Sequence, residues 1–314
     1  MGEFDLIRRI TAQAPTSGTG VVLGPGDDAA VLRLPPGQDL VLTTDTLVAG
    51  RHFPHDTPAA DVGWKVLAVN LSDLAAMGAD PGWITVALTL PEADEGWLAG
   101  FVTGLSELLV ASGALLVGGD LTRGPLAVTV TAAGHLPADT ALRRDRARPG
   151  DLVAVTGPLG DAALALALWA GDVPSPDSAQ GRLRRRLVRP QPQLEIGRRL
   201  RGVASAAVDV SDGLAVDLEQ MLAASGVGAD LQVDRVPASN AFAALCPAQQ
   251  RRGYQLNGGD DYELCVCVPA DAPVDVLERL VVVGQVRADP GLKLVGADGQ
   301  ELSFERHGYD HFSR

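Results

Sequence analysis

Cysteine is scarce in this chain of 314 residues, and its three cysteines form no CxxC pair. An odd number of cysteines without that spacing excludes a disulfide scaffold and a zinc-finger type of site, and it favours a reducing compartment. Cys265 and Cys267 alternate with valines. The alternation predicts that both side chains face one side of a strand, where inert packing is a commoner role than redox chemistry.

Long apolar runs are also missing. The longest ones, at 108–117 and 162–170, are much shorter than the roughly 20 residues that a helix needs to span a bilayer. The N-terminal sequence MGEFDLIRRI is charged and has no apolar core of a secretory signal. We therefore expect a cytoplasmic protein that has no membrane segment.

Basic residues are outnumbered, with 26 Lys and Arg against 39 Asp and Glu, which gives a net charge of −13. An acidic chain has no general affinity for phosphate backbones, so nucleic acid is not an expected partner. An anionic substrate would require local arginines or bound cations. The Walker A motif and the glycine-rich loop of protein kinases are absent too, so any use of ATP requires a different architecture.

Glycine is abundant, with 36 residues, and it stands next to aspartate in several places. Five segments share a small-residue or Gly-rich turn that contains aspartate: GPGDD (24–28), TTDT (43–46), GGD (118–120), DVSDG (209–213) and GGDD (258–261). Each of them alone is typical of a surface turn, because Asp and Gly both favour turns. Their number, and their position beside β-branched strands, favour a ligand site, because open α/β sheets bind ligands at strand ends.

The length predicts about two domains, and we place the boundary at the start of the Pro-, Gly- and Arg-rich stretch 137–150, giving domains 1–137 and 138–314. Both halves alternate strands and helices. The first half contains expected strands at 41–44, 83–90, 114–117 and 126–133 and expected helices at 58–77 and 94–112. The second half contains expected strands at 152–156 and 263–268, a helix that is capped by Asp161 and stopped by Gly171, and a helix at 213–224. Eight arginines in 182–201 follow a helical pattern and predict a solvated face.

Asp73 is the most informative of the acidic residues. In the expected helix 58–77 it lies on one stripe with Val62, Val66 and Val69, and the helix is apolar on nearly every side, so it should be largely buried. An unpaired buried carboxylate costs several kcal/mol. Its partner is therefore either an arginine of another segment or a hard cation. Clustered carboxylates without cysteine suit Mg²⁺, which usually also holds substrate phosphates.

Seven segments in order along the chain resemble the thiamine-monophosphate kinase family, as does the closing GYDHF (308–312). They are GPGDDAAV (24–31), TTDTLVAGRHF (43–53), KVLAVNLSDLAAMGADP (65–81), GGDLTRGP (118–125), RPGDLVAVTGPLGD (148–161), VDVSDGLAVDL (208–218) and GGDDYEL (258–264). The resemblance covers nearly the whole chain.

This resemblance implies transfer of the γ-phosphoryl group of ATP to thiamine monophosphate, the last step of thiamine diphosphate biosynthesis, with several Mg²⁺ ions and ATP as co-substrate. It also implies an α/β plus α+β, two-domain, synthetase-like fold. In that fold the N-terminal domain binds ATP and Mg²⁺ and forms a β-barrel across a homodimer, and a C-terminal α+β sandwich completes the active site.

The resemblance also implies roles for individual residues. The expected Mg²⁺ ligands are Asp28, Thr43, Thr44, Asp45, Asp73, Asp120, Asp209 and Asp212. The expected ATP contacts are Gly119, Asp120, Arg144 and Ser211, and the expected substrate contacts are His52, Asp260 and Tyr309. Arg143 and Arg146 are close enough to Arg144 to exchange roles with it. His52 taken alone could be a core or surface histidine, but its position beside the strand end at Asp45 favours a role facing phosphate.

One position departs from the family pattern. The family usually has GGEDYEL, and here the Glu is replaced by Asp260, which is one methylene shorter. The nucleophile would be a phosphate oxygen, already ionised near neutral pH because the second pKa of a phosphate ester is about 6. We therefore expect no catalytic base or nucleophile from the protein, and we expect catalysis by positioning and charge neutralisation.

Related functions fit these residues less well. Selenophosphate synthetase is disfavoured because its reactive residue lies in an N-terminal glycine-rich segment, whereas the first cysteine here is Cys246. Aminoimidazole ribonucleotide synthetase and the related hydrogenase maturation protein lack the sequence motifs found here at 43–53 and 65–81 in this form. A catalytically silent nucleotide-binding protein would have lost metal aspartates, and all of them are present here.

Overall fold

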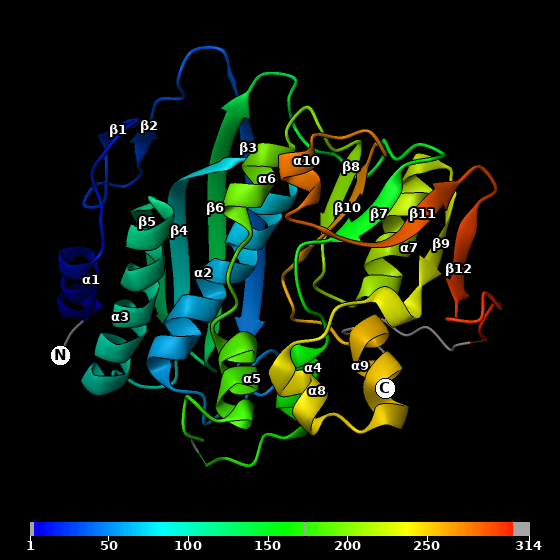
Figure 1. The fold of residues 1–314 in the computed structure, drawn as a ribbon. Coiled ribbons are helices and arrows are strands. Elements are labelled where there is room, and N and C mark those ends of the chain that lie inside the picture. The colour runs from blue at the N-terminus through cyan, green and yellow to red at the C-terminus, as the bar shows by residue number, and fades with distance from the viewer. Residues whose placement is uncertain (1–2, 173, 304–314) are drawn as a thin grey trace. The chain divides into compact units, whose positions relative to one another are not determined.

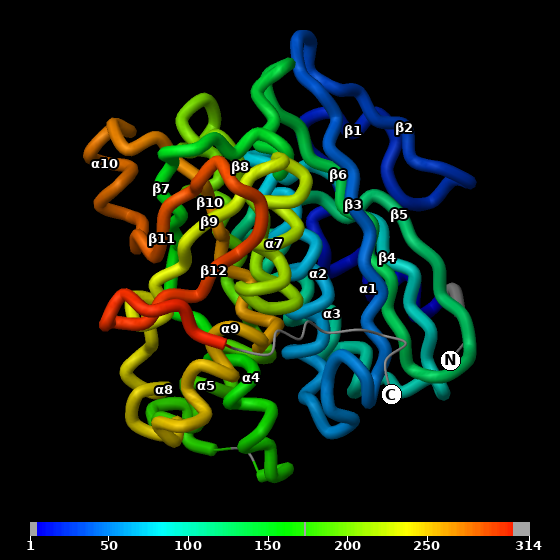
Figure 2. The backbone as a smooth tube through the Cα atoms, turned by 90° about the vertical axis from the view of Figure 1, so that its right-hand side faces the viewer, coloured from blue at the N-terminus to red at the C-terminus, as the bar shows by residue number. Residues whose placement is uncertain are grey.

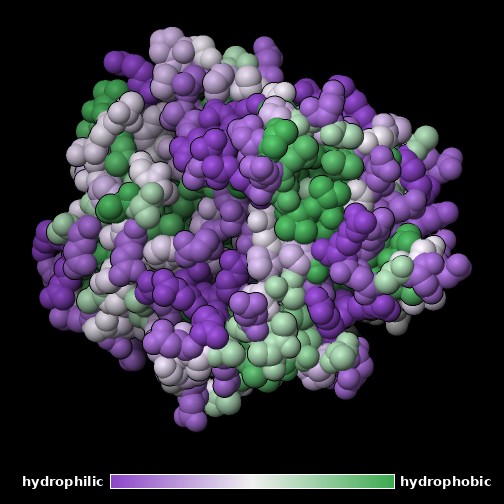
Figure 3. All heavy atoms as spheres, in the orientation of Figure 1, coloured by the Kyte–Doolittle hydropathy of each residue, from purple (hydrophilic) through white to green (hydrophobic). Residues whose placement is uncertain are grey.

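The computed structural model describes residues 3–172 and 174–303, so the GYDHF segment with Tyr309 lies outside the described residues. The chain divides into two compact units. Unit 1 comprises Met1–Leu74 and Ala79–Asp139, and unit 2 comprises Ala75–Gly78 and Thr140–Arg314. The face drawn in Figure 3 is largely hydrophilic, in keeping with the acidic sequence, and its apolar side chains gather in separate patches.

Unit 1 is built on a four-stranded sheet in the order β3-β6-β4-β5. Its elements are α1 (Glu3–Gln13), β1 (Val21–Leu23), β2 (Val31–Leu32), β3 (Gln38–Val48), α2 (Ala59–Ala76), β4 (Asp80–Leu90), α3 (Glu95–Ser112), β5 (Leu115–Arg123) and β6 (Ala127–Pro137). Helices α2 and α3 lie along one face of this sheet (Figure 1). In the described part of unit 1 the sheet stays open, with β3 and β5 as its edges, and forms no closed barrel.

Local sequence accounts for the helices of unit 1. The carboxylate of Asp94 accepts hydrogen bonds from the first backbone N–H groups of α3, and Gly113, with φ 76°, ends the helix in the left-handed conformation. Helix α2 is buried on nearly every side, as its apolar pattern predicts; Val66 and Leu67 are fully buried. The predicted helices 58–77 and 94–112 are thus confirmed within a residue or two.

Two segments that the sequence assigned to acidic turns are strand interiors. Strand β3 is paired with β6 along all of its length, so Asp45 lies within the strand and not at its end. Strand β5 continues through Gly118, Gly119 and Asp120 to Arg123. The turn preference of Asp and Gly is overridden because the neighbouring strands supply a continuous ladder of hydrogen bonds. Gly119 suits this position because a Cβ there would lie 2.1 Å from the carbonyl oxygen of Val86.

Unit 2 contains a six-stranded sheet in the order β12-β9-β11-β7-β10-β8, in which only β12 and β9 pair in parallel. Its strands are β7 (Leu152–Val155), β8 (Ala206–Asp209), β9 (Gly228–Gln232), β10 (Leu264–Val268), β11 (Val281–Arg287) and β12 (Gly291–Val295). Its helices are α4 (Asp161–Ala167), α5 (Ala179–Val188), α6 (Leu194–Leu200), α7 (Leu214–Ser225), α8 (Asn240–Leu245), α9 (Arg251–Asn257) and α10 (Val274–Leu277), with the short 3₁₀ turns η1 (Val233–Arg235) and η2 (Ala248–Gln250).

The sheet of unit 2 is covered on both faces. Cys265 and Cys267 face one core, which they share with residues of α7, and Leu264, Val266 and Val268 face a second core, which includes residues of α6 and α10. Helix α7 is seen lying along the sheet in Figure 2. Both cysteines are completely buried, so the expectation that they pack on one side of a strand is confirmed. Burial raises the pKa of the Cys267 thiol to about 12, which agrees with an inert role.

Two details of unit 2 differ from the sequence expectations. Asp161 is the first residue of α4 and not its cap: Gly160 occupies the cap position, and the side chain of the distant Asp261 accepts the hydrogen bond from the Gly160 N–H at 2.6 Å. The arginine-rich stretch forms two helices, because Pro190 and Pro192 cannot donate backbone hydrogen bonds. Its arginines are not all solvated: Arg184 is only 9% exposed and lies over the ring of Trp169.

Candidate active site

The register of the unit 1 sheet aligns predicted site residues from its two edges. Asp45 of β3 pairs with Val130, Val130 pairs with Val86 of β4, and Val86 pairs with Gly119 of β5. The next row runs from Thr46 to Asp120 in the same way. Segments 43–46 and 118–120, which are 72 or more residues apart in sequence, therefore lie in the same rows of one sheet. The structure places them there because pairing with β6 and β4 fixes the register.

Asp73 lies close to the β3 edge of this sheet. Its Oδ2 atom accepts a 2.6 Å hydrogen bond from the Thr43 hydroxyl, which joins α2 to β3. The valines that share its stripe are buried, with Val66 at 0% and Val69 at 3% exposure, but Asp73 itself is only partly buried. The expectation of a buried carboxylate was thus wrong for Asp73, although right for the rest of the stripe. Asp73 is open enough to bind a ligand from outside the core.

Strand alternation separates the expected metal ligands into two groups. Thr43 lies on the face that carries α2, and Asp45, two residues on, shares that face. Thr44 lies on the opposite, open face, where its hydroxyl contacts the Thr131 hydroxyl at 3.2 Å. Asp120 is exposed and pairs with the exposed Ala87, so it also belongs to the open face. A cation held by Thr43 and Asp45 could therefore reach Thr44 only through its backbone carbonyl.

His52 lies in the turn that follows β3. Its Nδ1 atom accepts a 3.0 Å hydrogen bond from the backbone N–H of Val48, so in the neutral ring the proton is on Nε2. Lys65 of α2 is buried, with 1% exposure. Its Nζ atom donates a hydrogen bond to the carbonyl oxygen of His52 at 3.2 Å. The turn is thus fixed from inside by contacts of both the His52 ring and its backbone carbonyl. Asp28, by contrast, is exposed in the segment between β1 and β2.

In unit 2, the segment 209–213 connects β8 to α7. Asp209 ends β8 and is 7% exposed, and Ser211 and Asp212 follow in the connecting loop. The backbone N–H groups of Ser211, Asp212 and Gly213 all donate to the Oδ2 atom of Asp217, each at 3.1 Å. One carboxylate of α7 therefore accepts hydrogen bonds from three successive residues of the loop.

Sequence reasoning missed Asp217. Its side chain is 4% exposed, and burial raises its pKa to about 7, against the opposing effect of the backbone N–H donors. A signal was available, because Asp217 lies in the first turn of the predicted helix and four residues after Gly213, which is within reach of the free N–H groups at a helix start. Asp217 thus joins the candidate site as the residue that shapes the Ser211 and Asp212 loop.

The loop 258–262 is hydrogen-bonded to the 209–213 segment. The backbone N–H of Asp260 donates to the Ser211 carbonyl oxygen, and that of Tyr262 donates to the Val210 carbonyl oxygen, both at 2.9 Å. Gly259 is required at this contact, because a Cβ there would lie 2.3 Å from the Ser211 carbonyl oxygen. The structure therefore brings together an expected ATP contact, Ser211, and an expected substrate contact, Asp260.

Asp260 and Tyr262 have positive φ values of 67° and 52°, which are uncommon for residues other than glycine. The Tyr262 hydroxyl donates a 2.8 Å hydrogen bond to Oδ1 of Asp260 and so orients its carboxylate. Backbone conformations of this kind are concentrated at functional sites. They identify the loop 258–262 as the strained part of the unit 2 site.

The arginines at 143–146 have different partners. Arg143 is paired with Asp145, which raises the pKa of its guanidinium, whereas Arg144 is exposed and donates to Oε1 of Gln220 at 3.2 Å. Gln220 belongs to α7, the helix that follows the 209–213 loop. Arg144 is therefore the arginine of this group that extends toward that helix.

The oxygen-only donors fit a hard cation. Among the described residues, no three side chains of His, Cys, Asp or Glu lie together as a complete metal site. Mg²⁺ does not require one, because it is commonly held by one or two carboxylates, waters and substrate phosphates. The hydrogen-bonded pair of Asp73 and Thr43 in unit 1 could contribute oxygens of that kind, as could Asp209 and Asp212, which lie three residues apart in unit 2. The described part of the chain also has no helix long and apolar enough to cross a membrane.

Comparison with known proteins agrees with this arrangement. The family model of the AIR synthase related protein N-terminal domain matches residues 26–136, and that of the C-terminal domain matches residues 148–297. Thiamine-monophosphate kinase of Salmonella typhimurium is 46% identical over 99% of this chain and 98% of its own length.

Solved structures agree as well. Thiamine-monophosphate kinase from Stenotrophomonas maltophilia is 45% identical, with a TM-score of 0.86 over 96% of this chain and 98% of that one. AaThiL complexed with AMPPCP and TMP is 30% identical, with a TM-score of 0.81 over 99% of this chain and 97% of that one. The resemblance read from the seven motifs is confirmed. The chain therefore belongs to the thiamine-monophosphate kinase family and has its two-domain, AIR synthase-like fold.

Proposed function

We propose that this protein phosphorylates thiamine monophosphate with ATP, giving thiamine diphosphate and ADP. The observation that carries the proposal is the full-length identity of 46% to a thiamine-monophosphate kinase. AMPPCP and TMP bound together in AaThiL support the same pair of substrates. A substrate phosphate oxygen would form the new bond to the γ-phosphorus of ATP. The bond from that phosphorus to the β,γ-bridging oxygen would break, with its electron pair leaving on ADP.

The residues of each unit would have different tasks in this reaction. Asp73 and Asp45 on the α2 face of the unit 1 sheet would hold Mg²⁺, as would Asp120 on its open face and Asp209 and Asp212 in unit 2. Bound Mg²⁺ would neutralise the negative charge of the phosphates, including the charge that develops on the leaving oxygen. The backbone at Gly119 and the side chain of Ser211, together with the guanidinium of Arg144, would contact ATP. The positions of these groups, and not a protein base, would account for the rate.

The acceptor would be bound by His52 and Asp260, with Tyr309 as a further contact. The contact with Val48 puts the proton of the neutral His52 ring on Nε2, and an N–H donor of this kind suits a phosphate oxygen. The carboxylate of Asp260 suits the positively charged thiamine moiety. Because Asp260 is shorter than the family's glutamate, we expect it to reach the ligand through water or through a shift of the loop 258–262.

An ADP-release assay with alternative acceptors tests the proposal directly. With ATP and Mg²⁺ present, thiamine monophosphate should support turnover, and unphosphorylated thiamine should not, because it lacks the phosphate nucleophile. Turnover with another phosphate monoester but none with thiamine monophosphate would reject the assignment.

Replacing Asp260 with alanine should raise the KM for thiamine monophosphate by about 5- to 150-fold, since a hydrogen bond to a charged group is worth roughly 1–3 kcal/mol. The KM for ATP should stay within about twofold. Asp260→Glu, which restores the family residue, should be tolerated. If Asp260→Ala lowers thermal stability and leaves both KM values unchanged, the side chain merely shapes the turn.

We also propose a homodimer in which the unit 1 sheets of two protomers close a barrel, with unit 2 as an α+β sandwich. The open face of the sheet supports this, because Leu40 and Leu42 of β3 are 55% and 64% exposed. An uncovered edge strand with such residues is a site of association. We expect a dimer mass by light scattering at micromolar concentration and a monomer mass for Leu42→Lys. A wild-type chain that scatters as a monomer would contradict the proposal.

A further inference from the structure

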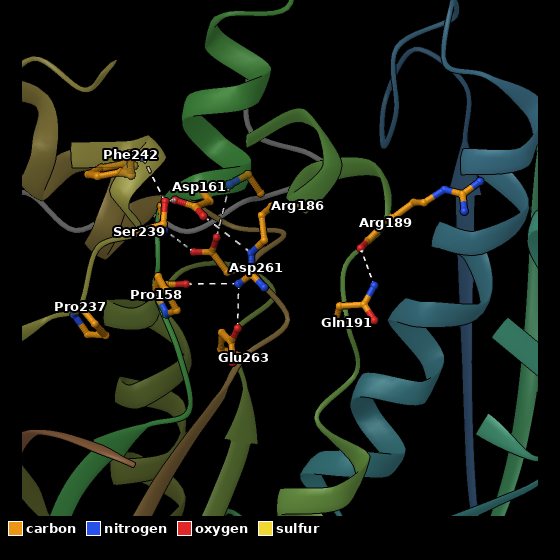
Figure 4. Close-up of polar contacts among 12 residues, drawn as sticks. Pro158, Asp161, Arg186, Arg189, Gln191, Pro237, Ser239, Phe242, Asp261 and Glu263 are labelled. Carbon is orange, nitrogen blue, oxygen red and sulfur yellow. Dashed lines mark hydrogen bonds and ion pairs between the residues drawn. The ribbon is translucent and has the colours of Figure 1, made fainter. Parts of the chain in front are cut away.

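A buried cluster of charged side chains adjoins the loop that carries Asp260 (Figure 4). We call it the Arg186 cluster; it consists of Asp161, Arg186, Asp261 and Glu263. The three carboxylates are 2–3% exposed, and the side chain of Arg186 is 26% exposed. The hydroxyls of Ser239 and Thr156 donate to Asp161 at 2.8 Å and to Glu263 at 2.6 Å. None of these residues belongs to the expected substrate or metal contacts.

Arg186 connects three parts of unit 2. Its Nη2 atom donates to Oε1 of Glu263 at 2.7 Å and to the carbonyl oxygen of Pro158 at 3.4 Å. Its Nε atom is 3.7 Å from Oδ2 of Asp161. One guanidinium on α5 thus joins the start of β10, the connection from β7 to α4, and the first residue of α4.

The charge balance of the cluster depends on Arg186. Burial raises the pKa of Asp161 and raises that of Asp261 to about 8, so the environment disfavours the charged form of both carboxyls. Arg186 is the cation in contact with Glu263 and Asp161. Breaking a buried ion pair by removing one partner is costly, because it leaves an uncompensated charge. Without Arg186, the Glu263 carboxylate would lose the cation that contacts it and would be expected to move toward water.

Such a movement would reach the loop, because Glu263 is three residues after Asp260. The positive φ values of Asp260 and Tyr262 are unfavourable for residues other than glycine and persist only where the surroundings hold the chain. One side of the loop is held by backbone hydrogen bonds to the 209–213 segment. Its other side is held through Asp261, which accepts from Gly160, and through Glu263.

We propose that Arg186 is a positioning residue for the acceptor: through Glu263 it holds the loop 258–262 in the strained conformation that presents Asp260 to the thiamine moiety. The inference rests on the proposed function of Asp260. A purely structural role for the cluster would lower stability and affect both substrates alike. A positioning role affects the acceptor selectively.

The test is steady-state kinetics on Arg186→Gln in the full-length enzyme. The KM for thiamine monophosphate should rise by about 5-fold or more, with the KM for ATP within about twofold. Arg186→Lys should recover part of the loss, because it keeps the charge. Arg185→Gln is the matched control on the same helix: Arg185 is exposed, and its replacement should leave both KM values unchanged.

Glu263→Gln provides a second variant if Arg186→Gln does not fold, since it removes the charge at nearly constant shape and should also raise the KM for thiamine monophosphate selectively. Equal rises in both KM values, or a lower unfolding temperature with unchanged KM values, would overturn the positioning role.

A double variant shows whether Arg186 acts through Asp260. In the Asp260→Ala background, Arg186→Gln should change the KM for thiamine monophosphate by less than about twofold, because coupled residues are not additive. A full additional rise would overturn the positioning role. A raised KM in Asp260→Ala with a normal KM in Arg186→Gln would overturn only the role of Arg186. A normal KM in Asp260→Ala would overturn the Asp260 assignment and, with it, this inference.

Discussion

Changing Asp73 or Asp120 to asparagine should lower Mg²⁺-dependent turnover by about 100-fold or more while the protein still folds. Asparagine has nearly the same volume as aspartate but lacks the charge that a hard cation requires. Asp73 is the partly exposed end of a buried stripe, and Asp120 is exposed on the edge strand β5. In neither position should removing the charge disturb the core.

Turnover measured against Mg²⁺ concentration, with circular dichroism of each variant, checks this prediction. The loss of turnover should persist at saturating Mg²⁺, because the two carboxylates are expected to position the metal in the transition state as well as to bind it. Glu92→Gln makes the same chemical change at an exposed residue of unit 1 and should have normal activity. Near-normal activity of both aspartate variants at saturating Mg²⁺ would remove Asp73 and Asp120 from the metal site.

Replacing Asp217 with alanine should have the second large effect. Three backbone N–H groups, those of residues 211–213, would lose the carboxylate oxygen that accepts their hydrogen bonds. Unsatisfied donors of this kind cost about 1–3 kcal/mol, so we expect a loss of at least that size in the free energy of unfolding. The loop that carries Ser211 and Asp212 should also lose its shape, raising the KM for ATP by about 10-fold or more.

Urea unfolding and ATP kinetics measure the two effects separately. Asp217→Asn keeps an acceptor oxygen in place and should retain more of both stability and ATP affinity than Asp217→Ala. If Asp217→Ala unfolds at the wild-type urea concentration and binds ATP normally, then the loop is held by other contacts, and Asp217 has no part in the site.

Elements with a strong local pattern were predictable from the sequence. The apolar residues of α2 and the capping residue Asp94 of α3 indicate these helices from local sequence, whatever segments the helices pack against. The alternation around Cys265 and Cys267 likewise specifies a buried strand. These signals depend on neighbours within a few residues, which are visible in the sequence. The family was predictable for a different reason, since its motifs are long and occur in a fixed order.

Other features arise only from contacts between distant segments. Asp45 and the Gly118–Gly119–Asp120 run look like turns, and become strand interiors because β6 and β4 pair with them. Arg186 has the pattern of a solvated residue, and becomes part of a buried cluster because Glu263, 77 residues away, supplies its partner.

The sequence by itself determined the family of this protein, its buried helices and strands, and the residue types available for phosphate and metal chemistry. The tertiary structure decided which of these residues meet: Thr43 with Asp73, Asp260 with Ser211, and Asp217 with the loop before it. The physical reason is that local propensity is set by adjacent residues. Register, the face of a strand and the partner of a buried charge are set by packing between segments that are far apart in the chain.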